Sequence, residues 1–130
     1  MPHDLQPLAM TCRWTFPGPV DPKACAQALG ELLVAIASGC QSPSGYVMGH
    51  IKAYAPLPAG GYIRANATSA RQPPDVEVQA PAGAMVTMVT GLDVTLNVLV
   101  VGLEPVACRR QVLRALDDVA ARHGFKQGEH

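Results

Sequence analysis

The chain has 130 residues, which is the length of one domain, and its ten basic and ten acidic side chains cancel. A domain of this size buries about two-thirds of its unfolded surface, so it needs neither disulfides nor a metal to fold. Balanced charge and few aromatic residues do not make the basic, aromatic-lined stripe typical of nucleic-acid-binding domains, so we expect no nucleic-acid partner.

Residues 1–10 lack a charged segment followed by an apolar one, the pattern that marks a secretory signal peptide. We therefore expect a cytoplasmic protein. A first strand is predicted over residues 8–16, and the sequence Pro17-Gly18-Pro19 is expected to end it. Apolar side chains alternate along this strand and share one face: Met10, Cys12 and Trp14.

A helix is predicted to begin after Asp21, because aspartate is a preferred N-cap and Pro22 suits the first helical position. Gly39 is expected to end this helix in the left-handed conformation. The apolar residues between them recur at helical spacing and predict a buried stripe: Cys25, Leu29, Leu32, Leu33 and Ile36.

Two paired strands are predicted over residues 46–55 and 61–69, joined by residues 56–60. Successive side chains of a strand point to opposite faces, so each strand places its polar residues on one side. The first strand contributes Tyr46, Met48, His50, Lys52 and Tyr54. The second contributes Tyr62, Arg64, Asn66 and Thr68. This gathering of unlike polar groups is the most informative feature of the sequence.

The second half of the chain predicts three more strands and a helix. Residues 76–79 predict a short edge strand, because prolines bound them. Strands over residues 84–90 and 92–103 follow, separated by Gly91. The second of these ends apolar on both faces, which favours a central place in the sheet. Its apolar run, residues 94–103, is about half the length of a membrane span, so we expect no membrane partner.

A final helix is predicted to begin at Pro105 and to end at Gly124, after which Phe125 folds back on the helix end. Its buried stripe comprises Val112, Leu113, Leu116, Val119 and Ala120. Residues 1–6 and 127–130 are expected to be flexible ends.

This order of elements predicts a single α+β domain over residues 1–130. We expect a two-layer sandwich with an antiparallel sheet and two helices, ferredoxin-like with an extra hairpin. A helix-grip arrangement is the alternative. Either architecture leaves one sheet face without helices, so that face is solvated, filled by a ligand or packed against another subunit.

His50 is the first candidate catalytic residue, because imidazole titrates near neutral pH. Lys52 lies two residues further along the same face and would favour the neutral imidazole. If the two strands pair, Lys52 and Arg64 come near cross-strand positions, where two cations repel unless an anion lies between them. Asp93 supplies that anion in one interpretation, and a bound carboxylate or phosphate supplies it in the other.

The full set of candidate ligand-binding residues is Tyr46, Arg64, Asn66, Asp93 and Asn97. No metal site is predicted, because the histidines are scattered and the cysteines lack close ligand spacing. We expect Cys12, Cys25, Cys40 and Cys108 to be reduced and buried. The glycines lack the strand–turn–helix setting of a phosphate loop and no covalent-catalysis motif is readable, so the sequence leaves any cofactor unknown.

Three functions remain open. The favoured one is a binding or accessory module for an anionic or polar small molecule, forming a homo-oligomer that buries the uncovered sheet face. The second is a lyase or isomerase that uses His50 as general acid and base and holds an anionic substrate with Lys52, Arg64 or Asn66. The third is a structural subunit of a larger assembly.

Overall fold

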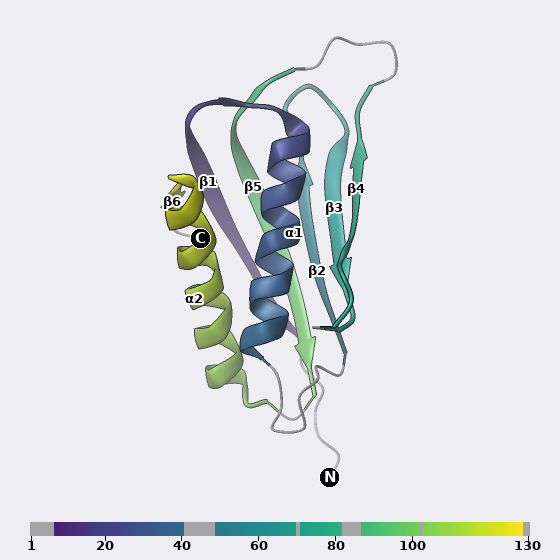
Figure 1. Ribbon diagram of the computed structural model, residues 1–130, viewed down its shortest axis with the longest axis vertical. Coiled ribbons are helices and arrows are strands. Elements are labelled where there is room, and N and C mark those ends of the chain that lie inside the picture. Colours follow the sequence, from purple (N-terminus) through teal and green to yellow (C-terminus); the bar gives the residue numbers. More distant parts are fainter. Residues whose placement is uncertain (1–6, 41–48, 70, 82–86, 102, 129–130) are drawn as a thin grey trace.

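The computed structural model describes residues 7–40, 49–69, 71–81, 87–101 and 103–128. Six antiparallel strands form one sheet in the order β4-β3-β2-β5-β1-β6, and two helices lie side by side on one of its faces (Figure 1). The strands are β1 (Leu8–Val20), β2 (Gly49–Pro56), β3 (Tyr62–Ala67), β4 (Asp75–Gln79), β5 (Val89–Val100) and β6 (Lys126–Gly128). The helices are α1 (Pro22–Gly39) and α2 (Pro105–His123). The predicted α+β two-layer sandwich is confirmed, whereas its ferredoxin-like detail stays a prediction.

The first strand is longer than expected, because Pro17-Gly18-Pro19 does not end it. β1 continues to Val20, and its pairing with β5 shifts register between Thr15 and Val20. An irregularity of this kind tolerates prolines, since the extra residues need no ladder hydrogen bonds. Gly91 was also misassigned: it lies inside β5, opposite Thr15, and does not separate two strands.

α1 begins as predicted. The Asp21 side chain accepts a hydrogen bond of 2.7 Å from the backbone N–H of Lys23, and Pro22 is the first helical residue. The helix ends at Gly39, but the expected left-handed conformation is wrong, because the C-cap is Cys40 with φ of −101°. Gly39 instead lies against the Gln111 side chain of α2: a Cβ there would lie 2.7 Å from its Oε1, a contact that the flexible glutamine can relieve by turning away.

Among the middle strands, β2, β3 and β4 agree with the sequence where the structure describes them. β4 is the edge strand predicted from its flanking prolines, and β5 is central, between β2 and β1. Residues 46–48 of the strand predicted over 46–55 and residues 84–86 of the strand predicted over 84–90 lie outside the described residues. Of the remainder of the second, Thr87 and Met88 lie in no strand, and Val89 and Thr90 belong to β5.

α2 ends at Gly124, whose φ of 75° is the left-handed conformation that was expected. The backbone N–H of Phe125 bonds to the carbonyl of Ala120, and the Phe125 ring lies 4.5 Å from that of Phe16. The next three residues form β6, which the sequence did not predict: residues 127 and 128 had been assigned to a flexible end, yet they pair with β1.

The hydrophobic core fills the space between the sheet and the two helices. Its largest fully buried side chains include Trp14 from β1, Leu96 from β5 and Leu32 from α1. Among the described residues, no polar or charged residue is buried, and neither helix is long and apolar enough to cross a membrane. The opposite face of the sheet carries the polar half of each alternating strand.

Candidate functional site

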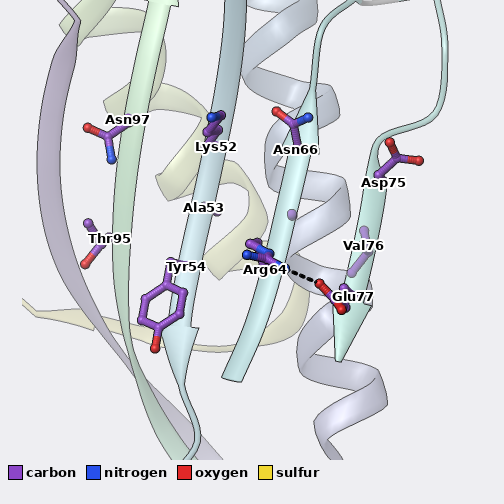
Figure 2. A pocket seen from close by; sticks show the side chains of 11 residues that line it. Lys52, Ala53, Tyr54, Arg64, Asn66, Asp75, Val76, Glu77, Thr95 and Asn97 are labelled. Atoms are coloured by element: carbon purple, nitrogen blue, oxygen red, sulfur yellow. Dashed lines mark hydrogen bonds and ion pairs between the residues drawn. The ribbon is translucent and has the colours of Figure 1, made fainter. Parts of the chain in front are cut away.

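The polar side chains on the uncovered face are arranged in two rows that cross four neighbouring strands, β4, β3, β2 and β5 (Figure 2). The first, here called the lysine row, consists of Asp75, Asn66, Lys52 and Asn97. The second, the arginine row, consists of Glu77, Arg64, Tyr54 and Thr95. Adjacent members of a row stand one strand spacing apart, about 4.8 Å at the backbone.

The two rows line a cavity of about 500 Å³ that is open to solvent. We call it the Lys52 groove. Its position follows from the alternation of each strand, because the residues between the polar ones point to the helices. Ala53, Ala65 and Leu96 are such residues, and all three are buried. The same alternation that builds the core therefore builds the polar floor of the groove.

The two charged residues of the arginine row, Arg64 and Glu77, form an ion pair. Nη2 of Arg64 donates to Oε1 of Glu77 over 2.6 Å, and the guanidinium lies 5.2 Å from the centre of the Tyr62 ring. Nε2 of Gln79 donates to the other Glu77 oxygen. The hydrogen bonds from Gln79 and Arg64 lower the pKa of Glu77, and the bond to Glu77 raises the pKa of Arg64. This pair stays ionised and largely neutralises itself.

The charged members of the lysine row have no such partners. Within the part of the chain that the structure describes, neither Lys52 nor Asp75 makes an ion pair or a side-chain hydrogen bond. Lys52 lies between the amides of Asn66 and Asn97, its cross-strand neighbours. Oδ1 of Asn66 is buried and lacks a hydrogen-bond partner. Within the described residues, the charges of Lys52 and Asp75 are therefore not neutralised by an ion pair.

The structure corrects the ion cluster that was one interpretation of the sequence. Asp93 lies directly opposite Arg13 of β1, and the two form an ion pair of 3.3 Å. Lys52 and Arg64 are not directly opposite each other either, because Arg64 faces Tyr54 across the strands. Asp93 consequently does not neutralise Lys52 or Arg64, and the predicted Lys52/Arg64–Asp93 cluster is wrong.

The groove brings together four of the residues proposed from the sequence and leaves others out. Its lining includes Lys52, Arg64, Asn66 and Asn97. His50 lies opposite Leu99 near the start of β2, and its side chain does not line the groove. Tyr46 lies outside the described residues.

Sequence reasoning missed the two acidic residues of the groove, Asp75 and Glu77. Both lie on β4 and alternate with Val76 and Val78, which point to the opposite face of the sheet. On that face Val78 packs against the hydrophobic core. That alternation was a readable signal, because it predicts one polar and one apolar face for the strand. What the sequence does not show is that β4 pairs with β3 and so places these carboxylates beside Arg64 and Asn66.

The thiols lie away from the groove. All four cysteines are buried and free. Burial raises the pKa of Cys12 and that of Cys25 to about 11. Cys40, at the end of α1, donates a hydrogen bond to Cys108 in the first turn of α2, which lowers the pKa of Cys108 to about 7 and raises that of Cys40. These two thiols join the helices at one end of the core.

Among the described residues, no three histidine, cysteine or acidic side chains lie close enough to hold a metal ion. Comparisons with protein-family models, with curated proteins and with solved structures found no match to this chain.

Proposed function

We propose that this protein is a binding or accessory module that holds a small anionic or polar ligand in the Lys52 groove. The observation that carries the proposal is the state of Lys52: an ammonium group on the floor of a concave surface, flanked by two amides and lacking an anionic partner among the described residues. Ammonium and amide N–H groups are the donors that a carboxylate or phosphate requires.

Energetics support a bound anion at this place. A hydrogen bond to a charged group contributes roughly 1.5–3 kcal/mol, whereas a solvated lysine on a sheet contributes little. The neighbouring Arg64 adds positive potential, although its charge is already shared with Glu77. We therefore assign the principal contact to Lys52 and a lesser one to Arg64.

The described lining of the groove holds no histidine or cysteine, the side chains best suited to transfer protons near neutral pH. This favours binding over the lyase or isomerase hypothesis, whose candidate general base, His50, does not line the groove. The homo-oligomer expected from the uncovered face remains a prediction, and native mass spectrometry of the untagged protein tests it together with any retained small molecule.

The proposal is tested by replacing Lys52→Met, which removes the charge and keeps the aliphatic stem. Lys126→Met is the matched control, because Lys126 is an exposed lysine of β6 outside the groove. Butyrate and inorganic phosphate are titrated in turn, and the side-chain amide signals of Asn66 and Asn97 are followed by nuclear magnetic resonance.

We expect at least one of the two anions to shift both amide signals in the native protein and in Lys126→Met. Lys52→Met should weaken that binding at least about tenfold, because it loses a charge-assisted contact. Equal affinity of Lys52→Met and the native protein for the anion that binds would overturn the proposal.

A further inference from the structure

The fixed charges of the groove are ordered from one side of the sheet to the other. The acidic side chains stand on the edge strand β4, the basic ones on β3 and β2, and the neutral Thr95 and Asn97 on β5 (Figure 2). Since Arg64 and Glu77 pair with each other, the row that contains them presents little net charge. Two charges of opposite sign are then left over, Lys52 and Asp75.

These two charges belong to the same row but do not meet. Lys52 is opposite Asn66, and Asn66 is opposite Asp75, so two strand spacings, about 10 Å, separate their backbones. Between them stands an amide whose Oδ1 atom is buried and has no donor. The lysine row thus presents a cation, an amide and an anion in that order (Figure 2).

A ligand that carries only negative charge is attracted at one end of the row and repelled at the other. Its carboxylate would contact Lys52 but would also lie near the unpaired carboxylate of Asp75, and like charges repel. A ligand that carries a cationic group at its other end satisfies both. An ammonium placed at Asp75 is the kind of donor that the acidic end of the row lacks, and it points back toward the amide of Asn66.

We infer that the ligand of the Lys52 groove is a small zwitterion of the ω-amino acid class, with its carboxylate at Lys52 and its ammonium at Asp75. This inference rests on the proposed function and narrows it to a chemical class. Taking the backbone separation of about 10 Å as the distance between the two charged groups, a hydrogen bond of about 3 Å at each end leaves about 4 Å for the ligand, which suits a chain of three or four carbons. β-Alanine and γ-aminobutyrate have this length.

The test compares three probes of equal chain length: γ-aminobutyrate, butyrate and butylamine. Affinities are measured by calorimetry for the native protein and for Asp75→Asn, which keeps the size of the side chain and removes its charge. Asp118→Asn is the matched control, because Asp118 is an exposed aspartate on α2, away from the groove.

We expect the native protein and Asp118→Asn to bind γ-aminobutyrate at least about tenfold more tightly than butyrate or butylamine. Asp75→Asn should abolish that preference and leave butyrate binding undiminished. Butyrate binding as tight as that of γ-aminobutyrate, or a preference that survives Asp75→Asn, would overturn this inference alone. If none of the three probes and no inorganic phosphate binds, both the inference and the proposed function are overturned.

Discussion

Gly61 fixes how closely the edge strand β4 approaches its neighbour, and we predict that Gly61→Ala is strongly destabilising. The residue precedes β3 and has φ of +87°, a conformation that costs an L-residue about 1–2 kcal/mol. A Cβ at this position would overlap the backbone carbonyl oxygen of Gln79 and lie 2.9 Å from its carbonyl carbon. Because the obstacle is backbone, no side-chain rotation relieves it, and β4 has to move.

The expected loss of stability has two contributions, the strained backbone conformation of residue 61 and the displacement of β4. Moving the end of β4 weakens the pairing of Tyr62 with Gln79, and each hydrogen bond there is worth about 0.5–1.5 kcal/mol. Together with the backbone conformation, Gly61→Ala should lower the free energy of unfolding by about 2–4 kcal/mol. β4 also carries Asp75 and Glu77, so ligand affinity should fall in the same variant.

The neighbouring Gly60 is the matched control. Its φ is +104°, but the nearest atom to a Cβ there is Cγ of Pro81 at 3.5 Å, an ordinary contact. Gly60→Ala should therefore cost the conformational part alone, about 1–2 kcal/mol. Urea denaturation of both variants measures the difference. If Gly61→Ala is no less stable than Gly60→Ala, the close approach of β4 to Gly61 is refuted.

Two further predictions concern the core. Leu96→Ala should lower the free energy of unfolding by about 2–5 kcal/mol, because Leu96 is fully buried on the central strand; a loss under 1 kcal/mol in urea denaturation would contradict its place there. The pKa of Cys108 is lowered from 9.0 to about 7 in the folded state, so its stabilisation is present above the unfolded value and is lost as the pH falls through 7. Stability should accordingly rise between pH 7 and 9 by up to about 1.4 kcal/mol per pH unit. Cys40→Ala removes the donor and should flatten this rise; an unchanged slope in that variant would refute the hydrogen bond as its cause.

Local chemistry predicted most of the fold. Asp21 and Pro22 begin α1 as their residue types require, and the alternation of the strands identified which side chains form the core. Three predictions made from glycine or proline residues are wrong, in each case because of strand pairing or a contact with a distant part of the chain. Pro17-Gly18-Pro19 lies in an irregular part of β1, Gly39 lies against Gln111 of α2, and Gly91 lies under the guanidinium of Arg13. A sequence shows that such residues are special but not whether they end an element or allow a close contact.

The candidate site was predicted less well, because it depends on strand order and register. Alternation placed Lys52, Arg64 and Asn66 on one face correctly. The partner of each charge is decided across strands, and no local pattern shows that β5 lies between β2 and β1. For that reason Asp93 was assigned to the wrong cations, although it is paired with Arg13.

The pairing pattern of this face separates charges that pair within the sheet from Lys52, which has no such partner among the described residues. Arg64 with Glu77 and Arg13 with Asp93 occupy directly opposed positions, where opposite charges add modestly to the stability of a sheet. Lys52 faces amides on both sides and so gains nothing comparable from the fold. Removing the Lys52 charge should therefore leave the free energy of unfolding nearly unchanged. We expect Lys52→Met to lose the proposed ligand and to keep the urea midpoint of the native protein. A lowered midpoint would show that the Lys52 charge stabilises the fold and would contradict this assignment.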